Sequence, residues 1–328
     1  MKIINFALIG TGVGIHHAKA ILKNKNSKLK YICETNKKKI KNLKKKFPHT
    51  HVISDENIIF KDKAVDAVSI ASYDHFHYSQ IIKCIKTNKN IFVEKPVCTN
   101  LKELLDIEKK IKKKKIFISS NLVLRTCSLF KQFKAHIKKN KISPIYIEAD
   151  YIWGRYFKLM GWRSKSKNYS LINGAAIHMI DLIMWMLEAK PKYVTAFGNS
   201  MKNSDRYNGH TFNLLILEFG NGLIVKISAN ALSKLEHDHN IEIYFENGSF
   251  FKQFNNKFLI NKQKKKINLN YSYPDKKSRS EVINSFSNFI AIGKGKKIVD
   301  KTEVFDVMKV CFYAIKSLKK NRKIKIKY

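Results

Sequence analysis

The sequence lacks any stretch long and apolar enough to cross a membrane. Its 328 residues contain no uninterrupted apolar run near the length of roughly 18 residues that a spanning helix needs. The apolar opening at residues 3–9 leads into a glycine-rich turn and not into a small-residue cleavage site, so we interpret it as a buried strand. We expect a cytoplasmic protein that has no membrane partner.

Cysteine is scarce and dispersed. The five cysteines form no CxxC pair, and they are Cys33, Cys84, Cys98, Cys127 and Cys311. An odd, scattered set in an intracellular chain indicates free thiols, and it argues against a zinc site. We therefore expect neither disulfides nor a bound metal.

Acidic residues and arginine are also few. There are 64 basic against 25 acidic residues, a net charge of +39, and only six of the basic residues are arginine, which leaves 58 lysines. Nucleic-acid recognition relies heavily on the planar fork of arginine, so the composition predicts no dedicated nucleic-acid surface. A nucleic-acid-binding protein remains a minor alternative, and its binding would depend steeply on salt. The positive field would attract anionic substrates such as sugar nucleotides.

The first 122 residues alternate short apolar strands with amphipathic helices, and the whole chain has the length of two domains. We expect strands at 3–9, 29–33, 52–53, 67–71, 90–93 and 116–118, with helices at 16–25, 37–47, 76–87 and after Thr99 or Asn100. This alternation predicts an α/β domain at 1–122, a Rossmann doubly wound parallel sheet. Ligands bind such sheets at the carboxyl ends of the strands.

After residue 122 the pattern changes to long alternating segments. We expect strands at 145–151, 192–198, 211–219, 222–230, 240–246 and 249–260, joined in part by hairpin turns at 220–222 and 247–248. Helices are expected at 128–139, 175–187, 280–292 and 303–320. Residues 123–328 are therefore predicted to form an α+β domain, built on a large, mostly antiparallel open sheet.

A glycine-rich turn, Gly10-Thr11-Gly12-Val13-Gly14, follows the first strand and opens a helix. Such glycines let the backbone approach a pyrophosphate, although a GxGxxG motif would have its third glycine at Ile15. Glu34 ends the second strand 24 residues after Gly10. An acid at that place accepts the ribose hydroxyls of NAD and repels a 2′-phosphate. We predict NAD, with NADP left open.

Two further strand ends carry polar residues. Ser72, Tyr73, His75 and His77 follow the fourth strand and would line the cofactor cleft, although one histidine could simply start the helix. Glu94-Lys95-Pro96 ends the next strand. Four segments thus converge on one sheet edge.

With Glu94-Lys95-Pro96 the sequence resembles the glucose–fructose oxidoreductase, inositol dehydrogenase and rhizopine-catabolism family, the Gfo/Idh/MocA oxidoreductases. The resemblance covers nearly the whole chain. It rests on the Gly10 turn, the 72–77 segment, Glu94-Lys95-Pro96, Asn121 with Arg125, Gly161-Trp162-Arg163, the segment from Gly174 to Asp181, Trp185 and the closing helix. It implies an NAD-dependent dehydrogenase acting on a CH–OH group of a sugar, cyclitol or sugar nucleotide.

The resemblance also implies residue roles. Lys95 would be the catalytic lysine and would also contact the substrate hydroxyl, while Glu94 would help to hold the nicotinamide ribose. His178 would be the second catalytic residue, with Asp181 one helical turn on to orient it or to contact substrate. Oxidation of a secondary alcohol needs a base for the hydroxyl proton, and a partly desolvated lysine can have a pKa low enough to share it.

Further residues receive roles that each compete with a purely structural one. Trp162 and Arg163 resemble the segment that the family places near the nicotinamide. The remaining candidates for the substrate side are Asn121, Arg125, Tyr156 and Asn173. The amphipathic second sheet resembles the face through which the family forms dimers or tetramers, so we expect a homodimer or homotetramer.

One departure from the family matters for catalysis. Many members have an aspartate four residues before the catalytic histidine, where this chain has Gly174, and the glycine usual in that motif is Ala176. Lys95 and His178 would then transfer the proton without that carboxylate. The alternative is a redox-inactive family member that binds NAD and a sugar.

Overall fold

The computed structural model describes residues 2–140, 142–166, 169–200, 207, 209–253, 258–261, 263–269, 273, 275–295 and 297–328. The chain forms two compact units. The first comprises residues 1–122 and 277–305, and the second comprises 123–276 and 306–328. The first division falls at the sequence-based boundary, whereas residues 277–305, which we had grouped with the second domain, return to the first unit.

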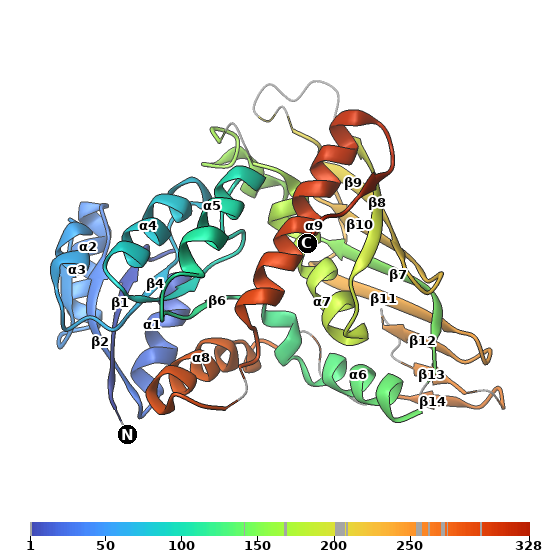
Figure 1. The fold of residues 1–328 in the computed structure, drawn as a ribbon, viewed down its shortest axis with the longest axis horizontal. Helices are drawn as coiled ribbons and strands as arrows, with labels where there is room; N and C mark the ends of the chain where they lie inside the picture. Colours follow the sequence, from blue (N-terminus) through green and yellow to red (C-terminus); the bar gives the residue numbers. More distant parts are fainter. Residues whose placement is uncertain are drawn as a thin grey trace. The chain divides into compact units, whose positions relative to one another are not determined.

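The first unit contains a six-stranded parallel sheet with the order β3-β2-β1-β4-β5-β6 (Figure 1). Its strands are β1 (Ile4–Ile9), β2 (Ser27–Cys33), β3 (His51–Ile53), β4 (Ala67–Ile70), β5 (Asn90–Val93) and β6 (Ile118–Ser120). This is the strand order of the dinucleotide-binding fold, with its reversal between β1 and β4. The predicted doubly wound sheet is confirmed.

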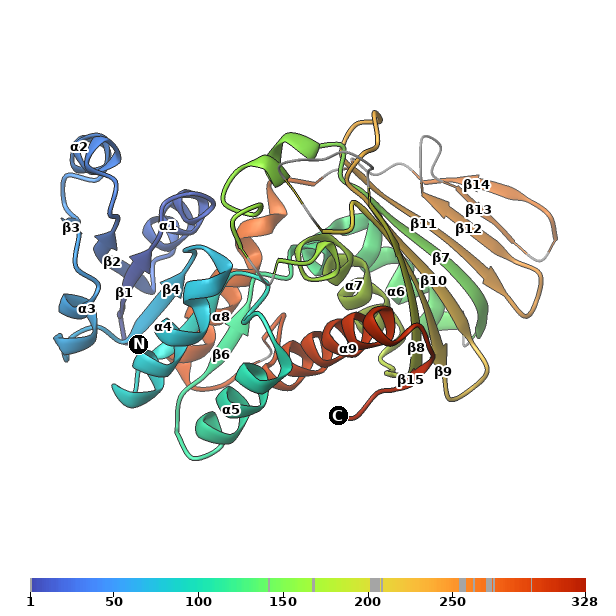
Figure 2. The same cartoon turned by 90° about the horizontal axis from the view of Figure 1, so that it is seen from above.

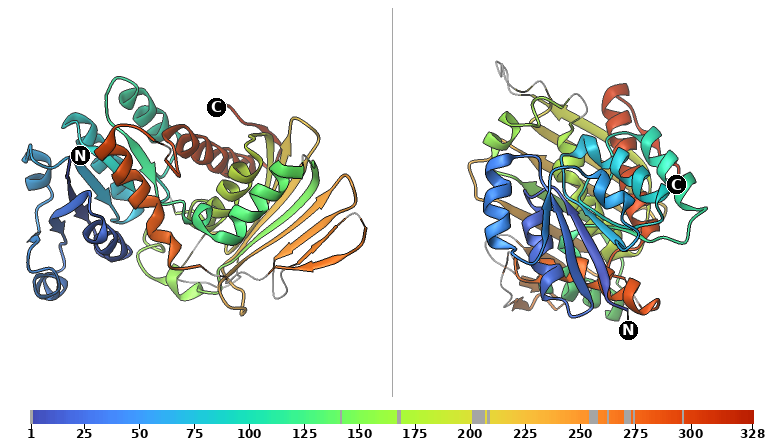
Figure 3. Two further views of the ribbon diagram at one scale, coloured as in Figure 1. Left: turned by 90° about the horizontal axis from the view of Figure 1, so that it is seen from below. Right: turned by 90° about the vertical axis from the view of Figure 1, so that its left-hand side faces the viewer.

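Helices pack on both sides of this sheet (Figures 2 and 3). They are α1 (Gly14–Lys23), α2 (Lys37–Lys46), α3 (Asn57–Lys61), α4 (Asp74–Lys86), α5 (Leu101–Ile111) and α8 (Glu281–Ile292). Helices α1 and α8 contact each other and β1, whereas α4 contacts α5, β4 and β5. The return of α8 is explained by its aromatic side chains: Phe286 lies against Phe6 and Phe92, with ring centroids 6.4 and 5.7 Å away.

The second unit contains a nine-stranded sheet with the order β14-β13-β12-β11-β7-β10-β9-β8-β15. Its strands are β7 (Pro144–Ile152), β8 (Pro191–Asn199), β9 (Phe212–Phe219), β10 (Ile224–Asn230), β11 (Asp238–Phe245), β12 (Phe250–Gln253), β13 (Phe258–Ile260), β14 (Lys266–Asn268) and β15 (Ile324–Lys325). Neighbouring strands are antiparallel except β7 and β10. The predicted mostly antiparallel open sheet is therefore confirmed.

The described α-helices of the second unit lie on one face of its sheet (Figures 1 and 2). They are α6 (Ser128–Asn140), α7 (Ile177–Leu187) and most of α9 (Lys301–Lys320). Strand β7 shows the resulting alternation: Ile147, Ala149 and Tyr151 are buried, while Glu148 and Asp150 between them are half-buried. The alternating pattern in the sequence thus reflects a sheet with one covered face.

Several elements differ from the sequence-based expectation. Helix α3 and strands β14 and β15 were not expected, because each is five residues or shorter and has no clear periodicity. The single strand expected at 249–260 is instead β12 and β13, and residues 254–257 of that prediction lie outside the described residues. The helix expected from residue 175 begins as a short π-helical turn, Ile172–Ala176, ahead of α7.

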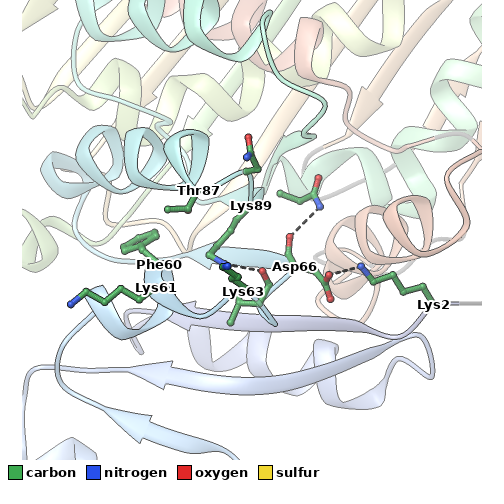
Figure 4. A pocket seen from close by; sticks show the side chains of 10 residues that line it. Lys2, Phe60, Lys61, Lys63, Asp66, Thr87 and Lys89 are labelled. Atoms are coloured by element: carbon green, nitrogen blue, oxygen red, sulfur yellow. Dashed lines mark hydrogen bonds and ion pairs between the residues drawn. The ribbon is translucent and has the colours of Figure 1, made fainter.

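A surface cavity of about 540 Å³ opens at the amino ends of β1, β4 and β5, away from the edge where the candidate residues converge (Figure 4). Lys2, Lys61, Lys63 and Lys89 line it. The ammonium of Lys89 donates to the carbonyls of Asp62 (2.6 Å) and Val65 (3.0 Å), so we assign this lysine a structural role. Among the described residues, no helix is long and apolar enough to span a membrane.

Candidate active-site residues

The glycine-rich turn joins β1 to α1 at the carboxyl edge of the first sheet. Gly10 has φ +88°, and a Cβ at this position would lie 2.5–2.7 Å from backbone atoms of Ala71 and Ser72. Only glycine allows this conformation and this close approach to the end of β4. A Cβ on Gly12, in contrast, would meet nothing within 4 Å. The turn is therefore packed tightly on its inner side and open at Gly12, as an approaching pyrophosphate requires.

Gly14 has the packing role that the third glycine of the common motif has. A Cβ there would lie 3.0 Å from side-chain atoms of Ala71 and Leu8, so the glycine at the first residue of α1 favours close packing of this helix on the sheet. The displaced third glycine noted in the sequence thus still brings helix and strand together. Thr11 is buried in the turn, whereas Val13 is exposed.

Glu34 ends β2 and is held from two sides. The Thr11 hydroxyl donates a short hydrogen bond to Oε2, and the backbone N–H of Asn36 donates to Oε1 at 3.0 Å. Partial burial raises the pKa of Glu34, but these hydrogen bonds and the ammonium of Lys39, 3.8 Å away, together lower it below its ordinary value. Glu34 is therefore a fixed negative charge beside the turn, able to accept hydroxyls of an adenosine ribose.

The segment after β4 contains both buried and exposed residues. Tyr73 and His75 are exposed, and their rings lie 6.1 Å apart. His77 is fully buried, with Nδ1 2.7 Å from the carbonyl oxygen of Pro96 and Nε2 3.2 Å from that of Ser72. This places His77 as a link between the ends of β4 and β5, while Tyr73 and His75 remain the predicted cofactor contacts of this segment.

Glu94 follows β5 and is the most enclosed acid of this edge, with 8% of its surface exposed. Its Oε1 accepts hydrogen bonds from His17 Nε2 (3.0 Å) and Asn121 Nδ2 (2.6 Å). Burial raises the pKa of Glu94, but its hydrogen bonds to His17 and Asn121 and the positive charge of Lys95 lower it below its ordinary value. Glu94 is thus a buried carboxylate that keeps its charge, directly before the half-buried Lys95.

These residues fit NAD. The open turn at Gly12 provides room for a pyrophosphate, and the two carboxylates, Glu34 and Glu94, suit two ribose rings. No described group of His, Cys, Asp or Glu has the arrangement of a metal site.

In the second unit, Arg125 and Asp181 form a buried ion pair. Arg125 Nε lies 3.1 Å from both carboxylate oxygens, and Nη2 donates to Oδ1 at 2.6 Å. Each side chain is 1% exposed. Sequence reasoning had placed both residues on the substrate side. Their burial favours a structural role, in which Arg125 anchors helix α7 and thereby the helix turn that carries His178.

His178 lies in the first turn of α7, among aromatic and imidazole rings. The Tyr151 ring stacks on it at 5.5 Å with an interplanar angle of 8°, and His239 is 6.3 Å away. His237 and His239, which share one face of the chain at the start of β11, also contact Tyr151. We call Tyr151, His178, His237 and His239 the imidazole cluster. Of these four residues, only His178 was predicted from the sequence. The two-residue spacing of His237 and His239 was the available signal for the others.

Next to α7, a Cβ on Gly174 would overlap the hydroxyl of Tyr169. The space that an aspartate would use there is therefore filled by this tyrosine. Asn173 is 3% exposed, and among the described residues no hydrogen-bond donor reaches its Oδ1. A buried, unsatisfied acceptor suits a ligand hydroxyl.

Arg163 is surrounded by aromatic rings. Its guanidinium carbon lies 4.4 Å from the Trp162 ring and 5.6 Å from those of Trp153 and Tyr169. These contacts hold the planar group by cation–π attraction. Tyr156 begins a short 3-10 turn nearby in sequence and is partly exposed.

The fold and the edge described above define a dinucleotide-binding domain joined to an α+β unit. A family model described as "Oxidoreductase family, NAD-binding Rossmann fold" matches residues 4–122, and the model of the GFO/IDH/MocA C-terminal domain matches residues 130–251. The chain belongs to the Gfo/Idh/MocA oxidoreductase family. The predicted family, the predicted enzyme class of NAD-dependent dehydrogenase and the predicted cofactor NAD are confirmed.

Relatives and solved structures agree with this assignment. The chain is 24% identical over 253 residues to scyllo-inositol 2-dehydrogenase (NAD(+)) of Bacillus subtilis (strain 168), covering 76% of this chain and 73% of that protein. It shares its fold with scyllo-inositol dehydrogenase from Lactobacillus casei, solved with NAD(H) and scyllo-inositol (TM-score 0.82, 18% identity, 99% of each chain). It also shares it with a UDP-N-acetylglucosamine 3-dehydrogenase from Acidithiobacillus ferrooxidans (TM-score 0.81, 15% identity, 98% of this chain and 99% of that one).

Proposed function

We propose that the protein interconverts a secondary alcohol and a ketone of a sugar, cyclitol or sugar nucleotide, with NAD as the redox partner. The observation that carries the proposal is the pair Glu94 and Lys95, in which a charged, buried carboxylate directly precedes a half-buried lysine at the cofactor edge. The names of the relatives, inositol and UDP-N-acetylglucosamine dehydrogenases, support the substrate class.

The first unit holds the cofactor in this proposal. The turn from Gly10 to Gly14 receives the pyrophosphate, Glu34 accepts the adenosine ribose hydroxyls, and Glu94 accepts those of the nicotinamide ribose. Ser72, Tyr73 and His75 form the adjoining wall, the buried His77 links the ends of β4 and β5, and Trp162 and Arg163 are further cofactor contacts in this proposal. Bound NAD supplies the group that takes up or returns the hydride.

The proton is handled by Lys95 and His178. In its neutral form Lys95 accepts a hydrogen bond from the reacting hydroxyl and takes its proton as the carbonyl forms, and His178 shares or relays that proton. Tyr151, stacked on the His178 ring, fixes the plane of the imidazole. On the substrate side we retain Asn121, Tyr156 and Asn173, of which Asn173 has the buried acceptor described above. Arg125 and Asp181 support this side indirectly, through the position of α7.

A Lys95→Ala variant tests the mechanism. Turnover is followed by the near-ultraviolet absorbance of NADH with myo-inositol, scyllo-inositol and UDP-N-acetylglucosamine. We expect kcat to fall by about 10²- to 10⁴-fold while the Kd for NAD changes little. Lys102→Ala, at an exposed lysine of α5, is the matched control and should retain wild-type turnover. Full turnover by the Lys95 variant would overturn the proposed proton transfer.

Gly174 favours one second candidate, a family member that binds NAD and a sugar without redox chemistry. The Tyr169 hydroxyl fills the place of the missing aspartate, so no carboxylate at position 174 can assist His178. This candidate predicts that bound NAD is unchanged in absorbance with every sugar of the panel, even at long incubation. Any substrate-dependent formation of NADH by wild type, lost in Lys95→Ala, decides against it.

We further propose a homodimer or homotetramer that associates through the face of the second sheet opposite its helices. That face combines the exposed Phe197 of β8 and Ile224 of β10 with ordered ion pairs such as Lys226 to Glu148 (2.8 Å). Light scattering should give a multiple of the 38.2 kDa chain mass. A monomer mass at micromolar concentration would refute it.

We also propose a cytoplasmic location. All five cysteines are buried, and Cys33, Cys84, Cys98 and Cys127 are free thiols, which suits a reducing compartment. Fractionation of the source cells, with detection by antibody, would test this.

A further inference from the structure

His17 is a buried histidine of α1 that the proposed reaction does not use. It is 3% exposed, and its ring meets the Phe92 ring edge-on at a centroid distance of 5.2 Å. Nδ1 lies 2.9 Å from the hydroxyl of Ser69, and Nε2 lies 3.0 Å from Glu94 Oε1. Ser69 is itself fully buried in the middle of β4. Ser69 of β4, Phe92 of β5 and Glu94 thus contact the His17 ring from three sides and hold it in one orientation.

The partners determine how the ring is used. Glu94 is a charged carboxylate and can only accept, so His17 Nε2 carries the hydrogen of this contact. In the neutral ring Nδ1 then accepts, and the Ser69 hydroxyl is the donor that satisfies it. Asn121 Nδ2 lies 3.2 Å from His17 Nε2, and each of these two nitrogens bears hydrogen. Asn121 therefore donates to Glu94 and not to the His17 ring.

The two donors leave the carboxylate asymmetric. Both hydrogen bonds that the described residues donate to Glu94 end on Oε1. Oε2 therefore keeps its acceptor capacity for a ligand. Rotation of the carboxyl group would break both bonds, which fixes the plane of the acid and the direction of Oε2.

We propose that Ser69, His17 and Glu94 form a positioning relay, in which Ser69 sets the tautomer of His17 and His17 aims the Glu94 carboxylate at the nicotinamide-side ribose of NAD. His17 is a positioning residue because it acts through Glu94. The proposal rests on the assignment of Glu94 to that ribose in the proposed function. The relay explains why a histidine is buried at this place in the first unit, although an apolar residue there would need no hydrogen-bond partners.

Three ligands separate positioning from folding. NAD and ADP-ribose contain the second ribose, whereas AMP contains only the adenosine side that Glu34 serves. Titration calorimetry would measure the Kd of each for wild type, His17→Leu, His17→Gln and Ser69→Ala. The glutamine places an N–H where Nε2 stands and is the conservative variant. Thermal unfolding of each apo variant would accompany the titrations.

We expect His17→Leu to raise the Kd for NAD and ADP-ribose about tenfold or more, and to leave that for AMP within about twofold. His17→Gln should recover most of the affinity, and Ser69→Ala should show a smaller loss confined to the same two ligands. In a Glu94→Ala background, His17→Leu should add no further loss, since its effect passes through Glu94.

Two results would overturn the relay alone: wild-type NAD affinity in His17→Leu while Glu94→Ala binds weakly, or an equal loss for all three ligands that His17→Gln does not recover. Wild-type NAD affinity in Glu94→Ala would instead remove the role of Glu94 in the proposed function, and the relay with it. The two failures are therefore distinguishable.

Discussion

Each unit contains one buried carboxylate near its candidate residues, and the two are held differently. Asp181 in the second unit faces a full positive charge, since Arg125 Nε contacts both of its oxygens and Nη2 adds a further bond to Oδ1. Among the described residues, those that hold Glu94 in the first unit donate to one of its oxygens, from an imidazole and an amide. Arg125 engages both oxygens of Asp181, whereas Oε2 of Glu94 is left able to accept from a ligand.

The difference indicates how burial and function combine in this fold. A buried charge needs a partner, and a carboxylate whose two oxygens both contact a buried arginine serves the structure and is not available to a ligand. A carboxylate held by one-sided hydrogen bonds keeps both its charge and an acceptor. We therefore assign structure to Arg125–Asp181 and ligand contact to Glu94, and the substitutions below test that division.

The largest effect is expected from breaking the buried ion pair between Arg125 and Asp181. Asp181→Leu leaves the Arg125 guanidinium buried without its counter-charge, and should lower the free energy of unfolding by about 3–5 kcal/mol. Urea denaturation followed by circular dichroism measures this. The matched control is Glu218→Ala, which removes a surface pair with Lys323 and should cost less than about 1 kcal/mol.

The double variant Arg125→Leu/Asp181→Leu sharpens the result. Without either charge, the penalty of an unpaired buried ion disappears, and much of the stability should return. If Asp181→Leu cost no more than Glu218→Ala, the pair would have no structural role, and its assignment to the substrate would regain support.

Glu94→Gln should behave in the opposite way. The amide oxygen of glutamine can still accept from His17 and Asn121, so the free energy of unfolding should fall by about 1 kcal/mol or less. The other position changes from an acceptor to an N–H donor, and the Kd for NAD should rise about tenfold. A large loss of stability with unchanged NAD affinity would make Glu94 the structural acid and remove the contrast with Asp181.

The sequence predicted the first unit better than the second. The turn from Gly10 to Gly14, Glu34 and Glu94 are adjacent to strands whose apolar runs are plain, and strand order brings them to one edge because parallel strands end together. His17 was not recognised, since a histidine on an apolar helix face carries no local sign of its partners at residues 69 and 94.

In the second unit the relevant neighbours come from distant segments. Arg125 and Asp181 are 56 residues apart, and Tyr151 meets His178 and His239 from another strand. The alternation at 145–151 predicted a strand but did not show which helix would cover one of its faces. The family resemblance supplied His178, whereas the imidazole cluster and the Tyr169 ring at Gly174 required the structure. Such pairings depend on packing between segments, which local periodicity does not encode.

The smallest expected effect concerns Glu34. Both of its oxygens accept hydrogen bonds, as in Asp181, but the donors are neutral groups, as for Glu94, and Glu34 is only partly buried. Its pKa lies below the ordinary 4.5, so the stability that its charge contributes is fully present above that value and is lost as the pH falls through the lowered pKa. The difference in urea midpoint between wild type and Glu34→Gln should thus be constant above pH 4.5 and shrink below it. A difference that grew on acidification would mean that the Thr11 and Asn36 contacts favour the protonated acid, and Glu34 would then lose its place as a charged acceptor for the adenosine ribose.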